Sequence, residues 1–154
     1  MIVAELAPSI RQAMPADLDR LVEIDVEIFG MASFPRFVLR QYLDLFQEGF
    51  FVVERDGEIL GYSVLGMEEG ADTAWLLTTG LKRNSRGLGL GDALLRRSND
   101  IARALGARRL KLTVSVDNAP AIQTYESKGF EIVSTEADYY DNGFSRHLME
   151  RAVD

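Results

Sequence analysis

The sequence predicts a mixed α/β fold in which helices cover one sheet, within a single domain spanning residues 1–154. Three observations support this fold class. A chain of 154 residues can bury one sizeable core but not two independent ones. Its 47% hydrophobic and 27% charged residues are typical of globular proteins. Strand and helix periodicities follow each other in the order β-α-α-β-β-β-α-β-α-β-β.

The first elements are a short strand and two helices. Residues 9–11 form the expected strand, and Pro15 stands where the first turn of a helix accepts a proline. This helix runs to about Phe29 with apolar residues at helical spacing, and Asp25 falls in the middle of its apolar stripe. A second helix with its own apolar face begins near Pro35.

Three strands are expected next. The segments 50–55 and 58–65 are joined by Asp56-Gly57, a pair that strongly favours a two-residue hairpin turn. The segment 73–81 is rich in apolar and β-branched residues, which also indicates a strand.

The second half continues with a glycine-dense turn and a helix whose apolar spacing extends to Leu105. Residues 110–116 alternate between apolar and polar side chains, which predicts a strand with one polar face. A short helix over 119–127 stops before Gly129, its expected cap. The last strands are 131–135 and 144–151, on either side of Asp141-Asn142-Gly143.

The charges are unevenly distributed. With 17 Lys+Arg against 24 Asp+Glu the formal net charge is −7, which argues against non-specific binding of nucleic acid. Residues 82–111, however, contain nine basic and only two acidic residues, so this segment carries +7 and the remainder −14. A basic segment within an acidic chain indicates an anionic ligand of limited size.

Several classes of function are excluded by composition. The chain has no cysteine, so disulfides, thiolate metal sites and a cysteine nucleophile are excluded. With a single histidine as well, a catalytic transition-metal site is not expected. No apolar stretch is long enough to cross a bilayer and residues 1–7 do not resemble a secretory signal, so the cytoplasm is the expected location.

The sharpest functional signal is a glycine-rich segment, Arg86-Gly87-Leu88-Gly89-Leu90-Gly91. It joins a strand to a helix, where backbone N–H groups and the helix dipole converge on an anion. Glycines allow the backbone to approach a phosphate closely. The spacing fits neither the dinucleotide-binding G-x-G-x-x-G nor a Walker loop, which ends in Gly-Lys-Ser/Thr. The alternative is a turn without a ligand.

This segment resembles the pyrophosphate-binding signature of the GNAT superfamily of acyl-CoA-dependent N-acyltransferases, R/Q-x-x-G-x-G/A, which follows the fourth strand of that fold. The matching residues are Arg86, Gly89 and Gly91. A second region is similar to the family's N-x-x-A-x-x-x-Y-x-x-x-G-F, through Asn118, Ala121, Tyr125, Gly129 and Phe130. The resemblance covers essentially the whole chain and is greatest to N-terminal acetyltransferases of ribosomal proteins and peptides.

The resemblance implies a mostly antiparallel sheet flanked by about four helices, with the fourth and fifth strands splayed around the pantetheine arm of acetyl-CoA. Acetyl-CoA is then the co-substrate, and no metal is involved. The residues implied to bind it are Thr79, Gly80, Leu81, Arg86, Gly87, Leu88, Gly89, Leu90, Gly91, Asp92, Asn118 and Tyr125. Asn118 is equally well placed to cap its helix, and both roles are compatible.

Tyr125 is the expected catalytic residue, because the resemblance places its hydroxyl beside the CoA sulfur. A phenol with a pKa near 10 can donate a proton to the thiolate that leaves when an amine attacks the thioester. A core or capping tyrosine is the alternative. N-terminal-acetylating members often carry a glutamate on the fifth strand, whereas this chain has Thr113 at the corresponding position. We therefore expect proton removal through an ordered water.

Asp25 is a second candidate base, because a carboxylate on an apolar helix face invites a raised pKa. An ion pair or a less buried helix face is the alternative. Tyr139 and Tyr140 are expected, with Asp25, to line the acceptor pocket. Dimers are common in the family, so a homodimer is a further expectation.

The predicted function is an N-acetyltransferase that moves acetyl directly from acetyl-CoA to a primary amine, either a protein or peptide N-terminus or a small molecule. The alternative is a catalytically weak module that binds acyl-CoA as a sensor or interaction domain. The intact Tyr125 and the uninterrupted glycine-rich segment favour the enzyme.

Overall fold

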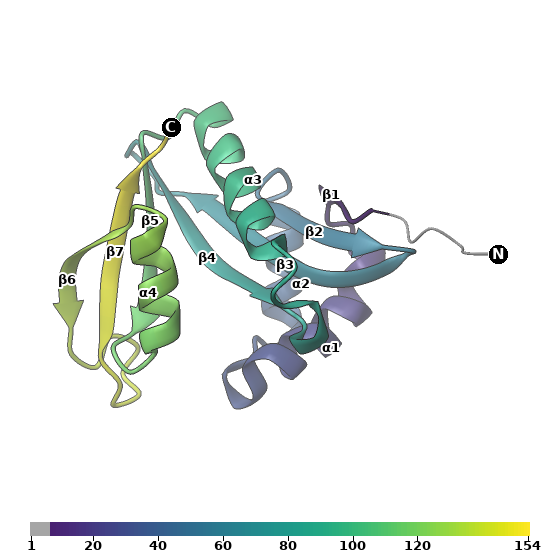
Figure 1. Ribbon diagram of the computed structural model, residues 1–154, viewed down its shortest axis with the longest axis horizontal. Helices are drawn as coiled ribbons and strands as arrows, with labels where there is room; N and C mark the ends of the chain where they lie inside the picture. Colours follow the sequence, from purple (N-terminus) through teal and green to yellow (C-terminus); the bar gives the residue numbers. More distant parts are fainter. Residues whose placement is uncertain (1–6) are drawn as a thin grey trace. The chain divides into compact units, whose positions relative to one another are not determined.

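The computed structural model describes residues 7–154. Its elements follow the predicted order, with three short 3-10 helices in addition (Figure 1). The strands and α-helices are β1 (Ser9–Gln12), α1 (Leu18–Phe29), α2 (Arg36–Leu45), β2 (Phe50–Arg55), β3 (Glu58–Met67), β4 (Thr73–Leu81), α3 (Leu90–Ala104), β5 (Arg109–Ser115), α4 (Ala119–Ser127), β6 (Glu131–Glu136) and β7 (Arg146–Ala152). The predicted α/β class is therefore confirmed.

The strands of the described residues form one sheet in the order β1-β2-β3-β4-β5-β7-β6. The pairs β1–β2, β2–β3, β5–β7 and β6–β7 are antiparallel, and β4–β5 is parallel. The sheet is thus mixed and mostly antiparallel, as expected. The β4–β5 ladder covers only Thr73–Trp75 against Arg109–Lys111, whereas β5 pairs with β7 along its whole length. A ladder this short agrees with the expected splay.

The chain divides into two compact units. Unit 1 comprises Met1–Gly66 and Leu77–Ile101, and unit 2 comprises Met67–Leu76 and Ala102–Asp154. Strand β4 contributes its first residues to unit 2 and its last residues to unit 1. The extent of a single functional domain over 1–154 stays a prediction.

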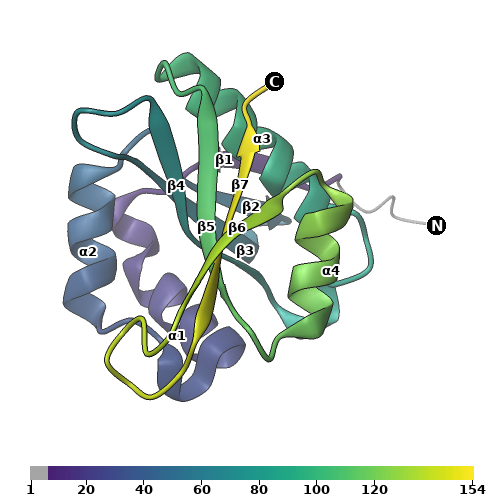
Figure 2. The same ribbon diagram turned by 90° about the vertical axis from the view of Figure 1, so that its left-hand side faces the viewer.

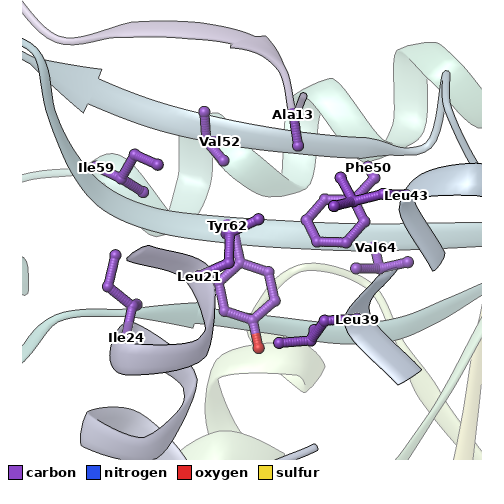
Figure 3. Packing of buried hydrophobic residues seen from close by; sticks show 10 residues of the cluster. All are labelled: Ala13, Leu21, Ile24, Leu39, Leu43, Phe50, Val52, Ile59, Tyr62 and Val64. Carbon is purple, nitrogen blue, oxygen red and sulfur yellow. The ribbon is translucent and has the colours of Figure 1, made fainter. Parts of the chain in front are cut away.

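Unit 1 has core clusters on both faces of its strands. Successive residues of β2 point to opposite faces, so Phe50 and Val52 pack with α1 and α2, while Phe51 and Val53 pack with α3. Figure 3 shows how side chains from both helices surround Tyr62 in the first cluster. Burial of each large apolar side chain contributes about 1.5–3 kcal/mol to folding.

Unit 2 is built around the strands β5, β7 and β6, with α4 next to them (Figure 2). The alternation predicted for β5 is confirmed. Leu110, Leu112 and Val114 are buried, and the polar residues between them are partly exposed.

Several boundaries differ from the expectation by one to three residues, and one of them is the start of β7, at Arg146 and not at residue 144. Phe144 is exposed, and its N–H donates to the Asn142 side chain, which keeps it in the turn.

Candidate active site

The predicted site residues belong to both units, and each unit is described separately. In unit 1 the glycine-rich turn lies between β4 and the N-terminus of α3. Gly87 and Gly89 have φ values of +78° and +79°, a region that side chains disfavour. No heavy atom lies within 4 Å of where a Cβ would stand at either position, so backbone conformation requires glycine here, not packing. Arg86, Leu88 and Gly91 are exposed like these two glycines, so the backbone is accessible to an anion at the helix N-terminus.

Leu90 and Asp92, at the end of the turn, contribute to the core and to the start of α3. Leu90 is buried in the cluster that includes Leu94 and Phe51, so only its backbone N–H is available to a ligand. Asp92 lies in the first turn of α3, where a carboxylate interacts favourably with the helix dipole.

The three β4 residues predicted to contact the cofactor have different environments. The Thr79 Oγ1 atom accepts a hydrogen bond of 2.6 Å from the Ser63 hydroxyl. A Cβ at Gly80 would meet the Ile28 side chain at 3.0 Å, so a close approach of α1 requires glycine there. Leu81 packs against the cluster beneath α3. The side chains of Thr79 and Leu81 thus have partners within unit 1, and the groups of this segment left for a ligand are those of the backbone.

Asp25 is fully buried in unit 1. The Tyr62 hydroxyl donates to its Oδ1 atom, and the Phe34 N–H donates to Oδ2 at 2.6 Å. Burial, and then the neighbouring carboxylate, raise the pKa of Tyr62 far above its ordinary value. Sequence reasoning offered an ion pair or a less buried helix face as alternatives for Asp25. The structure shows neither among residues 7–154, because both donors are neutral and Asp25 is fully buried. These contacts favour a structural role, while the part of Asp25 as base or acceptor ligand stays a prediction.

In unit 2, Asn118 caps α4. Its Oδ1 atom accepts a hydrogen bond of 3.3 Å from the Ala121 N–H, so the capping role considered for this residue is present. Binding of the pantetheine arm by Asn118 stays a prediction.

Tyr125 lies on α4, with its ring against the edge of Phe130 at 5.5 Å between centroids. Among residues 7–154, every buried side-chain oxygen has a hydrogen-bond partner. The Tyr125 hydroxyl has no such partner in this part of the chain, so it is not one of the buried oxygens. The hydroxyl oxygen therefore reaches the surface. Burial of the rest of the side chain raises the pKa of Tyr125 above its ordinary value near 10. The group thus stays protonated at neutral pH and can donate its proton.

On the polar face of β5, Thr113 contacts Tyr140 and Arg146. Sequence reasoning singled out Thr113 and Tyr140 but not Arg146. The Thr113 Oγ1 atom lies 3.0 Å from the Tyr140 hydroxyl and accepts a hydrogen bond of 2.9 Å from Arg146 Nε. The rings of Tyr139 and Tyr140 contact each other edge to face, and both side chains are exposed. Arg146 was not expected at the site, because its proximity to Thr113 depends on the register of β5 with β7, which no sequence motif gives.

The basic segment 82–111 is partly neutralised within each unit. Lys82 pairs with Glu58, Arg108 with Asp72, and Arg109 with Glu150. In the described chain, Lys111 of unit 2 contacts the Trp75 ring and has no carboxylate within 4 Å. Four cations of unit 1, beside or after the glycine-rich turn, also have no carboxylate within 4 Å. They are Arg83, Arg86, Arg96 and Arg97. Fewer positive charges are therefore available to an anionic ligand than the net +7 of residues 82–111 indicates.

Two negative findings concern residues 7–154 alone. No group of three or more His, Cys, Asp and Glu side chains is placed to hold a metal ion. No helix is long and apolar enough to cross a membrane.

Comparisons with known proteins identify the family. The family model described as "Acetyltransferase (GNAT) family" matches residues 18–130. An N-alpha-acetyltransferase of Sulfurisphaera tokodaii is 31% identical over 151 residues, which cover 91% of this chain and 90% of that protein.

Solved structures share the fold. Ard1 from Thermoplasma volcanium matches with a TM-score of 0.88 and 23% identity, over 97% of this chain and 99% of that chain. The ribosomal-protein-S18-alanine N-acetyltransferase of Escherichia coli matches with a TM-score of 0.82 and 22% identity, over 96% and 95%. The chain therefore belongs to the acetyltransferase (GNAT) family and is an N-acetyltransferase that transfers acetyl groups from acetyl-CoA to amines.

Proposed function

We propose that the acceptor is the α-amino group of a protein or peptide and that Tyr125 is the general acid. The observation that carries the catalytic part is the Tyr125 hydroxyl, which is protonated, reaches the surface and has no partner among residues 7–154. The neutral amine attacks the acetyl carbonyl, the nitrogen gives up a proton to water, and the C–S bond then breaks. Tyr125 gives its proton to the leaving thiolate.

The residue Thr113 supports an α-amino acceptor over a lysine side chain. Threonine cannot act as a base near neutral pH, so this strand position supplies no base and we propose that the acceptor loses its proton to water. At pH 7 about one α-amino group in seven is neutral, against roughly one lysine in 2,500. The relative from Sulfurisphaera tokodaii, named an N-alpha-acetyltransferase, is consistent with this acceptor.

We further propose that acetyl-CoA is held by the residues that the sequence motif indicated. The accessible backbone of residues 86–92 at the start of α3 supports binding of the pyrophosphate. The backbone of residues 79–81 and the Asn118 side chain then serve the pantetheine arm. A homodimer and a cytoplasmic location stay predictions.

The acceptor is tested with two peptides in an assay of CoA release. One has a free N-terminus and no lysine, and the other has a blocked N-terminus and one lysine. We expect transfer to the first and at least about a hundredfold less to the second at pH 7, since the neutral fractions differ by more than that. Equal rates, or preference for the lysine peptide, would contradict the proposed acceptor.

The general acid is tested with Tyr125→Phe, which keeps the ring contact with Phe130. We expect kcat to fall by about a hundredfold or more, with the thermal unfolding temperature unchanged, because only the donated proton is lost. The matched control is Thr124→Val, which removes an exposed hydroxyl from the same helix. A wild-type rate in Tyr125→Phe would remove this residue from the chemistry.

A further inference from the structure

Arg146 is held in a fixed orientation on the polar face of unit 2. It stands opposite Ser115 in the β5–β7 ladder, which places it diagonally beside Thr113 on the same face. Its Nε atom donates to the Thr113 hydroxyl at 2.9 Å, and its Nη2 atom donates to the Thr113 carbonyl at 3.0 Å. The guanidinium also lies 5.0 Å from the centre of the Tyr140 ring. Two strands and one loop thus orient this cation.

Arg146 has no carboxylate within 4 Å of its guanidinium among residues 7–154. Its partner in the β6–β7 ladder is Glu136, whose exposed carboxylate lies beyond that distance, whereas Arg109 on β5 pairs with Glu150. Asp138, in the loop before β7, accepts a hydrogen bond from the Gly143 N–H instead.

The guanidinium also has donors to spare. Only Nε and Nη2 donate to acceptors in residues 7–154, and the residue is partly exposed. The Nη1 and Nη2 atoms therefore present an edge with two N–H groups. This geometry matches a carboxylate bound by two parallel hydrogen bonds.

We infer that Arg146 binds a carboxylate of the acceptor, so that the preferred substrates are primary amines with a carboxylate close to the amino group. This inference rests on the proposed function and on the expectation from the sequence that Tyr139 and Tyr140 line the acceptor pocket. Thr113 on β5 holds Arg146 through its hydroxyl and its carbonyl. A fixed cation there repels a simple ammonium group, and an acidic group on the acceptor offsets that repulsion.

Two sources supply such a carboxylate: an acidic side chain near a peptide N-terminus, or the α-carboxylate of a free amino acid. The experiment separates them with pairs of acceptors that differ by one charge. The peptide pairs begin with Asp or Asn, or with Ala-Asp or Ala-Asn, and are otherwise identical. The amino-acid pair is alanine and alaninamide. The measured quantity is the ratio of kcat/KM within each pair.

In the wild-type enzyme we expect at least one pair to favour the carboxylate by about tenfold or more, the effect of charge-assisted hydrogen bonds. Arg146→Gln should bring this ratio close to one, with less than about a threefold change on the neutral member of the pair. Arg146→Lys keeps the charge but loses the planar edge, so an intermediate ratio is expected. The control Arg40→Gln removes a charge from the exposed side of α2 and should leave the ratio unchanged.

A second variant tests the inference without removing Arg146. Thr113→Glu places a carboxylate of the chain itself beside the guanidinium, which should abolish the preference for acidic acceptors. A purely structural role, in which Arg146 only joins β5 to β7, would change stability and leave the ratio of rates intact. Thermal unfolding of each variant is measured alongside for that reason.

The outcomes separate this inference from the function on which it rests. Transfer to neutral peptides, with equal rates within every pair, overturns the inference and leaves the proposed function standing. A preference for acidic acceptors that persists in both Arg146→Gln and Thr113→Glu also overturns it. Failure to acetylate any of the acceptors overturns both the proposed function and the inference.

Discussion

At the scale of single residues, the core of unit 1 contains a carboxylate that has no cation partner among residues 7–154. Asp25 is fully buried, and its oxygens accept from the Tyr62 hydroxyl and the Phe34 N–H. An unpaired buried charge costs several kcal/mol unless hydrogen bonds compensate for the water that it loses. The two donors come from β3 and from the segment before α2, so Asp25 ties α1 to both.

We therefore expect Tyr62→Phe to destabilise the protein by about 2–3 kcal/mol, because it leaves a buried charge with one partner fewer. For a chain of this size the unfolding temperature should fall by roughly 4–12 °C. Thermal denaturation followed by circular dichroism measures this change. Tyr139→Phe is the matched control: it also removes one hydroxyl, but from an exposed side chain, and should cost less than about 0.5 kcal/mol. Equal losses in the two variants would show that the contact with Asp25 contributes nothing.

At the scale of elements, the turn before α3 combines two requirements that point to the same residue type. The left-handed conformations of Gly87 and Gly89 disfavour a side chain, and the exposed backbone of this turn needs open space in front of it if a phosphate is to approach. The first requirement concerns folding and the second concerns binding. A comparison with another glycine of the same conformation can separate them.

Gly57 in the β2–β3 hairpin offers that comparison. Its φ is +76°, against +79° for Gly89, and no heavy atom lies within 4 Å of a Cβ at either position. Gly57→Ala and Gly89→Ala should therefore lower stability by similar amounts, about 1–2 kcal/mol. Only Gly89→Ala should raise the KM for acetyl-CoA, by roughly tenfold, because its methyl group stands where the pyrophosphate would lie. Steady-state kinetics and urea denaturation of both variants measure the two effects, and an unchanged KM in Gly89→Ala would exclude the turn from binding.

At the scale of the whole molecule, the sequence was sufficient for the order of the elements, since that order depends on periodicity and turn residues. The bounds of 73–81 and 119–127 were predicted to the residue. The contacts of Asp25 and the proximity of Arg146 to Thr113 could not be predicted, because both depend on side chains far apart in the chain. The net +7 of residues 82–111 was a correct count, but a count does not show which cations are paired.

The distribution of charge leads to a last prediction, on salt. The whole chain carries −7, so an anionic co-substrate is repelled at long range and must be attracted locally. Arg83, Arg86, Arg96 and Arg97 have no carboxylate partner in the described chain and stand beside or after the turn. Salt screens such exposed charges over about 8–10 Å at 0.1–0.15 M, so the KM for acetyl-CoA should rise between 0.05 and about 0.5 M NaCl. The slope should fall in Arg86→Gln and stay unchanged in Arg40→Gln, whose charge lies on α2. Initial rates at several salt concentrations measure these slopes. Equal slopes in the wild type and Arg86→Gln would show that Arg86 does not attract the co-substrate.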